Sequence, residues 1–367
     1  MKSRMPVRLI TVLLAGFVAI LIAGILFDRS QQSERRVAAG LRNPRGAVVL
    51  PDNAIIITEA GLPDSAGTTD KSTRQTTNGR LSWVRDNGDG RRTLLDSLPG
   101  QYVGLLNEVI GPSGIAQAPD RGLYILIGQC AQPRCGALHL LSSDGQFTQV
   151  ADLRAFAAAN PGVTDAGAPN EESNPWGIAV TADGIVFISD AAANDILRVD
   201  SRIAPARVSV HVRLPEQAVP TGIALADDGA LYVAIFTALK HPVGAGSVVR
   251  VASDGHITTA VEGLTMPIGI TVEPDGNLLV LEFSAAYSMD SGYRPRSGTL
   301  SRINLTTPAI RQMLATNLHF PTSVARASDG RVYVTAGGAF VGSARTPEGE
   351  LVQIRRTDPV RAWWRIW

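Results

Sequence analysis

Three carboxylates occupy the same place in three separate stretches of the sequence. Asp190 lies thirteen residues after Gly177 in the stretch SNPWGIAVTADGIVFISD, at the end of an apolar run. Glu59 and Glu282 stand at the equivalent place in two similar stretches. Carboxylates held close together repel one another unless a cation, a proton or an arginine compensates. The pattern therefore raises the question of whether the three acids lie close together in one site.

These acids belong to a unit that recurs six times. Each copy has a Pro-x-Gly corner, an apolar run, an Asp-Gly-like turn and a second apolar run, and a further strand–turn–strand segment follows. The corners begin at Pro44, Pro112, Pro175, Pro220, Pro267 and Pro321, and Ser323 replaces the last glycine. One four-stranded sheet cannot bury both faces, so such units pack around an axis. We predict an all-β fold, a six-bladed β-propeller over residues 37–367.

The connections between strands divide into two groups. First-to-second and third-to-fourth turns share one face of a propeller, and here they are short Asp-Gly hairpins whose aspartates are structural. We call this the tight-turn face. Second-to-third loops and the crossovers between blades share the other, loop-rich face, which carries the long segments 60–78, 101–111, 154–173, 237–246 and 284–297. Long loops on a rigid scaffold commonly carry binding, so we expect function on the loop-rich face.

All three acids fall at the level of the loop-rich face, in copies one, three and five. The matching residues of the other copies are apolar: Ile127, Ile235 and Ala336. One interpretation is a shared ligand or cation site made by Glu59, Asp190 and Glu282, with Ca²⁺ as the cofactor, because this ion takes 6–8 oxygen ligands. The other is that each acid caps the backbone amides of its own loop, or pairs with a neighbour such as Arg45, Lys240 or Arg294.

Further candidate ligand-binding residues lie on the same face. Arg45 and Trp176 occupy the middle of two Pro-x-Gly corners, and Trp176 either lines a mouth for an apolar ligand or plugs the channel. Tyr287 and Tyr293 either line the same mouth or anchor their loop. His241 and His319 are candidate bases, with packing of their loops as the alternative. The sequence contains no His-Glu-x-x-His, Gly-x-Ser-x-Gly or phosphate-loop motif.

The chain begins with a segment of different character. A basic flank, residues 1–8, precedes an uncharged apolar run over 9–27 and a polar stalk over 28–36. Nineteen residues are just enough to cross about 30 Å of hydrocarbon as a helix. We therefore predict a transmembrane or signal-anchor helix, with a cleaved signal peptide as the alternative. Either way the propeller lies outside the cytoplasm, in the periplasm or beyond the cell.

Composition and cysteine content limit the classes of partner and the compartment that we expect for the protein. With 34 Lys and Arg against 33 Asp and Glu the chain lacks the basic excess of a nucleic-acid-binding protein. The membrane, through the N-terminal helix, and an unknown small molecule or protein remain as partners. Cys130 and Cys135 close a small loop as a disulfide in an oxidising compartment, or remain two free thiols.

Two segments compete to complete the sixth blade. Residues 35–41, RRVAAGL, resemble the fourth strand that precedes each later corner, whereas residues 360–367, VRAWWRIW, follow the last repeat directly. Trp363, Trp364 and Trp367 pack on an outer strand or form an edge that faces the membrane or a partner. The sequence leaves the closure of the ring open.

The repeats LRNPRGAVV, SNPWGIAV, DAAANDILRVD, VPTGIALADDGALYVAIF and GNLLVLEF resemble the ScyD/ScyE family over Val37 to Gln353. This resemblance implies a secreted or membrane-anchored six-bladed propeller. The chain is more distantly similar to gluconolactonase-like, regucalcin-like and NHL-repeat propellers. The lactonases hold a divalent metal through an early Glu and through Asn and Asp in two corners. Here Trp176 and Thr221 stand in those corners, with Ile268 in the corner of the next blade, so two expected ligands are missing.

Two functions follow from these observations. The first is a membrane-anchored binding or scaffold module that takes a small molecule or protein on its loop-rich face. The alternative is a divalent-cation-dependent lactonase or esterase that uses Glu59, Asp190 and Glu282. A role in a secreted secondary-metabolite pathway is implied by the family resemblance alone. The sequence does not decide whether the protein is an enzyme.

Overall fold

The computed structural model describes residues 34–63, 72–86, 90–104, 106–163, 168–338 and 348–355. The predicted helix over 9–27 and the tryptophans of the segment 360–367 lie outside this range. Within it, no helix has the length and apolar character needed to cross a membrane.

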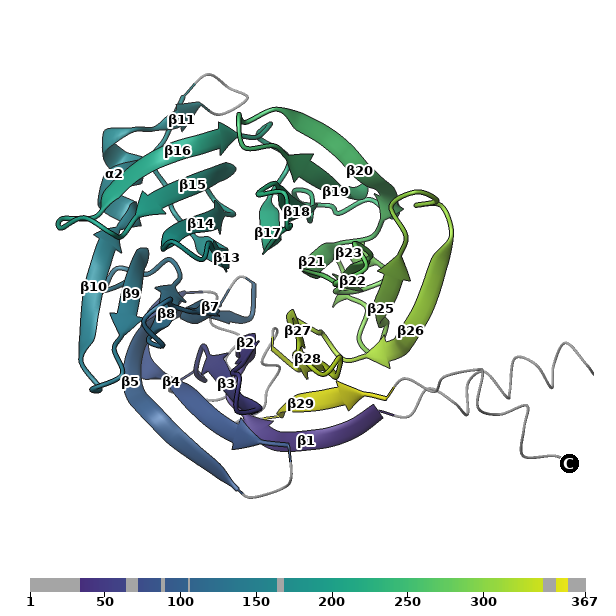
Figure 1. Cartoon of the computed structure of the whole chain (residues 1–367), viewed down its shortest axis with the longest axis horizontal. Coiled ribbons are helices and arrows are strands. Elements are labelled where there is room, and N and C mark those ends of the chain that lie inside the picture. The colour runs from purple at the N-terminus through teal and green to yellow at the C-terminus, as the bar shows by residue number, and fades with distance from the viewer. Residues whose placement is uncertain are drawn as a thin grey trace, which may run out of the picture.

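Six antiparallel sheets surround a central axis and follow one another in chain order (Figure 1), which confirms the predicted all-β six-bladed propeller. Blade one contains β2 (Pro44–Val49), β3 (Ala54–Glu59), β4 (Thr73–Arg85), β5 (Arg91–Val103) and β6 (Glu108–Ile110); blade two contains β7 (Pro112–Gln117), β8 (Leu123–Ile127), β9 (Ala137–Leu141) and β10 (Phe147–Asp152). Blade three contains β13 (Pro175–Val180), β14 (Ile185–Asp190), β15 (Asp195–Asp200) and β16 (Arg207–Arg213); blade four contains β17 (Pro220–Leu225), β18 (Leu231–Ile235), β19 (Gly246–Val251) and β20 (Ile257–Leu264).

Blade five contains β21 (Pro267–Val272), β22 (Leu278–Glu282), β25 (Gly298–Ile303) and β26 (Arg311–Leu318); blade six contains β27 (Ser323–Arg326), β28 (Val332–Ala336), β29 (Gly349–Ile354) and β1 (Glu34–Leu41). The loop-rich face carries the short helix α2 (Leu153–Ala159) and two hairpins, β11 (Gly162–Val163) with β12 (Pro169–Asn170) and β23 (Tyr287–Ser288) with β24 (Gly292–Tyr293). The apolar residues of the second and third strands fill the spaces between blades, where most are fully buried.

The Pro-x-Gly corners bring the backbones of neighbouring inner strands into close approach. A Cβ atom on Gly177 would lie 2.3 Å from the carbonyl oxygen of Thr221, and one on Gly46 would lie 2.5 Å from that of Ser113. Real Cβ atoms do not come this close to backbone, so these positions require glycine. In blade six, Ser323 is accommodated because its hydroxyl accepts a hydrogen bond from the Ala47 amide, at 3.3 Å.

Hydroxyl groups join the same strands from blade to blade. The middle residue of the corner in blades two, four and six donates a hydrogen bond of 2.8–2.9 Å to the proline carbonyl of the following blade, in the pairs Ser113–Pro175, Thr221–Pro267 and Thr322–Pro44. Thr58 and Ser189 in turn donate to the carbonyl oxygens of Ser113 and Thr221. The blades therefore alternate between two kinds around the ring.

The N-terminal strand closes the ring. β1 pairs antiparallel with β29, from Glu34 opposite Ile354 to Leu41 opposite Gly349, and forms the outer strand of blade six (Figure 1). This settles the closure in favour of the segment 35–41. Asp86 secures the join, because it pairs with Arg35 and with Arg331 (2.6 Å) and accepts a hydrogen bond from the Tyr333 hydroxyl (2.6 Å).

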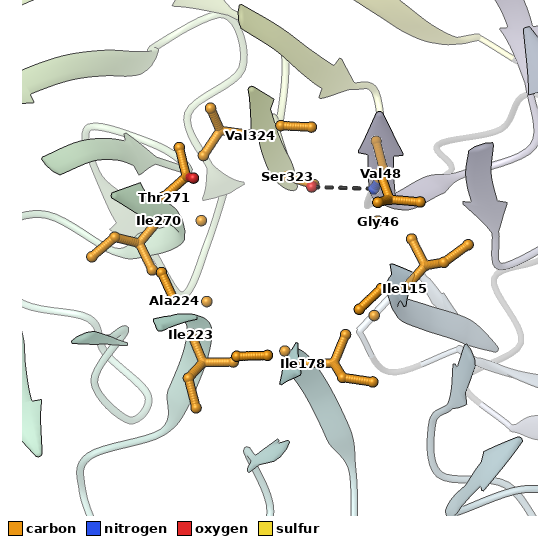
Figure 2. A pocket seen from close by; sticks show the side chains of 18 of the residues that line it. Gly46, Val48, Ile115, Ile178, Ile223, Ala224, Ile270, Thr271, Ser323 and Val324 are labelled. Carbon is orange, nitrogen blue, oxygen red and sulfur yellow. Dashed lines mark hydrogen bonds between the residues drawn. The ribbon is translucent and has the colours of Figure 1, made fainter. Parts of the chain in front are cut away.

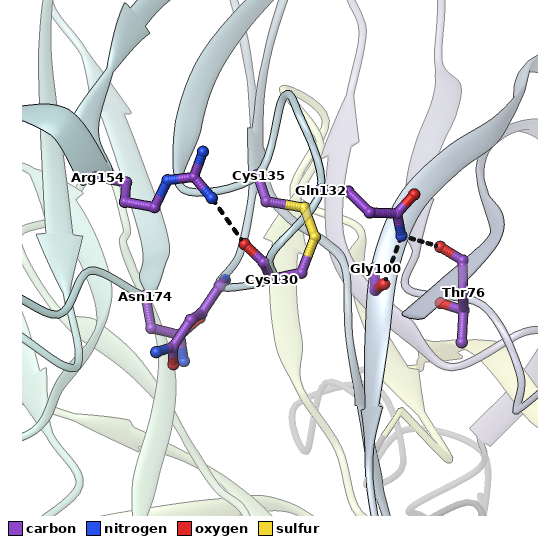
Figure 3. Close-up of a disulfide and its surroundings, with 8 residues drawn as sticks. Thr76, Gly100, Cys130, Gln132, Cys135, Arg154 and Asn174 are labelled. Carbon is purple, nitrogen blue, oxygen red and sulfur yellow. Dashed lines mark hydrogen bonds between the residues drawn. A yellow bond between two sulfur atoms is a disulfide. The ribbon is translucent and has the colours of Figure 1, made fainter. Parts of the chain in front are cut away.

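The predicted disulfide is confirmed. Cys130 and Cys135 are joined within a loop of blade two, with their Cα atoms 5.3 Å apart (Figure 3). Inside the loop, the Gln132 side chain donates hydrogen bonds to the carbonyl oxygens of Thr76 (2.8 Å) and Gly100 (3.0 Å) in blade one. Arg154 also donates to the Cys130 carbonyl, at 2.9 Å. The cross-linked loop therefore ties blade two to blade one.

We expect Gly177→Ala to destabilise the propeller by about 3 kcal/mol, because the new methyl group overlaps the Thr221 carbonyl and the inner strands must separate. Urea unfolding measures the loss. Ser323→Ala, at the equivalent place in blade six, serves as the control and should change the free energy of unfolding by less than about 1 kcal/mol. Equal stability of the parent and Gly177→Ala proteins would contradict the proposed close approach.

A buried histidine makes stability depend on pH. Burial, followed by the charge of Arg134, lowers the pKa of His139 from 6.5 to about 4 in the folded protein, where its ring stacks on Phe147. The unfolded chain takes up this proton at a higher pH than the folded one does. The contribution of His139 to the free energy of unfolding should therefore be fully present above pH 6.5 and fall by about 3 kcal/mol between pH 6.5 and 4. His139→Leu should flatten this part of a pH series of urea unfolding curves, and an unchanged slope would exclude His139 as the cause.

Candidate functional site

The inner strands of all six blades enclose a central cavity of about 410 Å³. Figure 2 looks into it and shows labelled residues from every inner strand around an open centre. Most of the residues that line it are glycines or have apolar side chains, with Ile115, Ile178 and Ile270 among them. The charged residues that line it are Arg45, at the loop-rich end of its strand, and Arg326, at the tight-turn end.

Arg45, one of the predicted ligand-binding residues, is held by contacts within blade one. Its side chain is buried, and Nη2 donates hydrogen bonds to Glu108 Oε1 (2.8 Å) and to the Val109 carbonyl (2.7 Å). The guanidinium lies 5.3 Å from the centre of the Trp176 ring. Nη1 is equally buried but makes no hydrogen bond within the described part of the chain. Arg45 therefore keeps donor capacity at the mouth of the cavity.

Trp176 takes the corresponding corner position in blade three and spans part of the loop-rich mouth. It lines the cavity together with Arg45 and Ile268, and it packs against an apolar cluster that includes Met266 and Phe283. Trp176 is therefore among the residues that line the cavity, as one of its two interpretations expects.

Aromatic side chains gather at the loop-rich ends of blades four to six, in the apolar cluster against which Trp176 also packs. We call this group the aromatic wall. Phe283 stands 5.2 Å from Tyr293, and Tyr287 stands 4.7 Å from Tyr293 and 5.3 Å from His241, between ring centres. Phe236 and Phe320 continue the cluster. Aromatic residues make up only 5% of the sequence, so their concentration here marks a specialised surface. The ring of His319 lies 4.6 Å from that of its neighbour Phe320, at an interplanar angle of 40°.

Tyr293 and His241 meet across two adjacent loops. The Tyr293 hydroxyl lies 2.7 Å from His241 Nε2, and His241 Nδ1 lies 2.9 Å from the Thr237 carbonyl oxygen. A carbonyl only accepts, so Nδ1 carries the proton and Nε2 accepts from the tyrosine. Burial lowers the pKa of His241, and burial followed by the charge of Glu108 raises the pKa of Tyr293. The carboxylate of Glu108 in blade one therefore affects the pKa of Tyr293 in the loop of blade five.

Glu59 is fully buried within its own blade. It accepts hydrogen bonds from the Arg42 amide (2.5 Å) and Arg80 Nη2 (2.9 Å), and it contacts the Ser82 hydroxyl. Arg42 belongs to the crossover that leads from β1 into blade one. The carboxylate therefore fixes that crossover to the end of β3.

Asp190 does the same for blade three. It accepts hydrogen bonds from the Ser173 hydroxyl (2.5 Å) and the Asn174 amide (2.8 Å) in the preceding crossover, and from the amides of Ala192 and Ala193 (each 3.2 Å) in the following turn. Burial raises its pKa, which these four donors oppose.

Glu282 completes the pattern in blade five. It accepts hydrogen bonds from the Thr265 amide (2.5 Å), again in the preceding crossover, and from the Thr299 hydroxyl (3.1 Å). Each acid thus engages the donors of its own blade, as in the loop-capping interpretation. Arg45, offered as a partner for these acids, pairs with Glu108 instead.

The described residues do not fit a shared Ca²⁺ site. Nowhere among them do three or more His, Cys, Asp or Glu side chains form a group that could hold a metal ion. Ca²⁺ takes 6–8 oxygen ligands at 2.3–2.6 Å, whereas the oxygen atoms of Glu59, Asp190 and Glu282 are occupied by donors in three different blades. The geometry does not bring the three acids together.

Sequence reasoning missed two features of the mouth. Glu108 carries no motif, and only its contact with Arg45 makes it part of the site. His241 and Tyr293 were considered separately, because a residue pair formed by two loops that lie 52 positions apart leaves no spacing signal.

Comparison with known proteins supports the fold. No known protein family and no curated protein matches the chain by sequence. Among solved structures, the PQQ-bound aldose sugar dehydrogenase of Streptomyces coelicolor is 15% identical with a TM-score of 0.56, over 88% of this chain and 98% of that one. A gluconolactonase from Xanthomonas campestris is 11% identical with a TM-score of 0.55, over 88% and 89%. Virginiamycin B lyase from Staphylococcus aureus is 13% identical with a TM-score of 0.50, over 88% and 99%.

At these identities the likeness concerns the propeller fold alone. The chain has structural neighbours of the gluconolactonase and virginiamycin B lyase type, and the resemblance to the ScyD/ScyE family stays a prediction.

We expect Asp190→Ala to lower the free energy of unfolding by about 2–4 kcal/mol, because it leaves the buried amides of its crossover and turn without an acceptor. We also expect the thermal melting temperature of the parent to be the same in Ca²⁺ and in EDTA. Asp254→Ala, in an exposed tight turn, is the control for loss of a carboxylate. A Ca²⁺-dependent rise in melting temperature that Asp190→Ala removes would restore the shared cation site.

Proposed function

We propose that the protein binds a small molecule at the loop-rich mouth of its central cavity. The ligand has a flat aromatic body and a neutral oxygen acceptor such as a carbonyl group. The propeller acts as a rigid binding module, and the loops of blades one, three, four and five supply the contacts.

The unpaired donor of Arg45 is the observation that carries this proposal. A buried N–H group without an acceptor costs about 1–3 kcal/mol, more when it is charged. Arg45 is 4% exposed, and its Nη1 makes no hydrogen bond within the described part of the chain. An acceptor atom on a bound molecule would recover this cost, and the cavity beside Arg45 provides the room.

Charge and shape define the ligand further. Glu108, 2.8 Å from Nη2, already balances the charge of Arg45, which favours a neutral acceptor over a carboxylate. Trp176 and the wall formed around Tyr287 and Tyr293 offer ring faces on which an aromatic body can stack. A ligand with these two features would engage both sides of the mouth.

The cation-dependent lactonase remains the alternative function. Solved gluconolactonase and sugar dehydrogenase propellers are compatible with it in fold. The three acids that would hold the cation are occupied in separate blades, which favours the binding module. We further propose that residues 9–27 anchor the propeller to a membrane, outside the cytoplasm, as the length of the apolar run predicts.

Hydrocarbostyril, an aromatic lactam, tests the binding site. We expect the full chain in detergent to bind it saturably in isothermal titration calorimetry. Arg45→Gln should weaken binding at least about tenfold, since a hydrogen bond to a charged donor contributes about 1.5–3 kcal/mol. Trp176→Leu should weaken it as well, through loss of the stacking surface.

Arg92→Gln provides the matched control. Arg92 also lies over a tryptophan, Trp83, at 4.1 Å, but on the exposed outer part of blade one. Thermal melts of each variant show whether it is folded. Absence of saturable binding, or equal weakening by Arg45→Gln and Arg92→Gln, would contradict the proposed function.

A further inference from the structure

Tyr293 and His241 have the arrangement of a proton-transfer pair. A hydroxyl group donates to an imidazole nitrogen at 2.7 Å, and the other ring nitrogen is held by the Thr237 carbonyl at 2.9 Å. An imidazole fixed by a third group, with its free nitrogen directed at a hydroxyl, is the common arrangement of a general base in enzymes.

Burial keeps His241 neutral and Tyr293 protonated, because it lowers the pKa of the histidine and raises that of the tyrosine. Burial lowers the pKa of His241, so the imidazole is neutral at physiological pH and able to accept a proton. After burial, the carboxylate of Glu108 and then Tyr287, on the same hairpin, contribute to the raised pKa of Tyr293. The Tyr287 ring also lies 5.3 Å from that of His241. Lys240 precedes His241 in the chain and is exposed.

Arg45 is connected to the pair through Trp176: its guanidinium lies 5.3 Å from the centre of the Trp176 ring, and Trp176 and Tyr293 pack against the same apolar cluster. Arg45 keeps Nη1 without a partner among the described residues, and Arg45 pairs with the Glu108 carboxylate whose charge reaches Tyr293. A donor that is fixed before a substrate arrives stabilises negative charge on a carbonyl oxygen as the bond order falls. A base and an oxyanion donor at one mouth are the two requirements for acyl transfer to water.

We propose that the mouth hydrolyses an aromatic lactone or aryl ester without a metal ion, with Tyr293 and His241 as the proton-transfer pair. This inference rests on the proposed binding function. Water transfers a proton to the Tyr293 oxygen as the Tyr293 proton moves to His241 Nε2, and the hydroxide bonds to the acyl carbon. The acyl C–O bond then breaks, and the proton on His241 returns through Tyr293 to the leaving phenoxide oxygen. Arg45 Nη1 donates to the acyl oxygen throughout.

Dihydrocoumarin, the lactone that corresponds to hydrocarbostyril, is the test substrate. We expect the full chain in detergent with EDTA to hydrolyse it, and Tyr293→Phe and His241→Gln each to lower kcat/KM at least about a hundredfold. The kcat/KM of the parent should fall as the pH drops below a midpoint under 6.5, the ordinary pKa of histidine. His241→Gln should lose this dependence together with most of its activity.

Tyr124→Phe is the matched control. Tyr124 lies on β8 in blade two, and its hydroxyl makes a hydrogen bond of 2.8 Å with the Ser201 hydroxyl, so the change also removes one hydrogen-bonded tyrosine hydroxyl. We expect its activity to stay within about twofold of the parent. Thermal melts and hydrocarbostyril binding by Tyr293→Phe should match the parent, because the ring and its contacts remain.

The outcomes separate the two proposals. Binding of hydrocarbostyril without hydrolysis of dihydrocoumarin would overturn the catalytic inference and leave the binding function intact. Failure to bind would remove both. Hydrolysis that EDTA abolishes would favour the cation-dependent alternative, and hydrolysis that survives both Tyr293→Phe and His241→Gln would exclude the pair as the catalytic residues.

Discussion

The structure depends on the close approach of six inner strands at their Pro-x-Gly corners. At Gly46 and Gly177 the carbonyl oxygen of the next blade occupies the space that a side chain would need. The strands can therefore surround a cavity of about 410 Å³ instead of separating into independent sheets. The hydroxyl of Thr221 and its counterparts then satisfy the carbonyl groups that this approach buries.

The same constraint explains the alternating acids. A chain that passes from an outer strand to the next inner strand must turn sharply on the loop-rich face, and its amide groups need acceptors there. Glu59, Asp190 and Glu282 supply them in alternate blades. Because these carboxylates already accept hydrogen bonds from the crossovers between blades, we assign the chemistry of the mouth to other residues. Arg45 and Trp176, fixed at the corners, provide its rigid side, and the loops of blades four and five provide the aromatic side.

The sequence predicts the ring well because the same corner and turn residues, each needed for the local backbone conformation, recur in six repeats. The glycine of each corner, the Asp-Gly turns and the pair Cys130–Cys135 all act within a few residues. The sequence also places Glu59 and Asp190 on the correct face. It cannot give their distance from the axis or the direction of their side chains, and these decide between a shared cation and separate caps. The Tyr293–His241 pair depends on how two long loops pack on each other, which no periodic pattern encodes.

The ring closure fixes the face from which the N-terminal strand starts. β1 begins at Glu34, next to the Asp86 turn on the tight-turn face, and runs toward the loop-rich face. If residues 9–27 span a bilayer, as we propose, the few residues between them and β1 would keep that bilayer on the tight-turn side of the ring. The mouth would then open toward the aqueous compartment, on the side remote from the lipid. Molecules would reach it by diffusion through water, and one dissolved in the bilayer would first have to leave it.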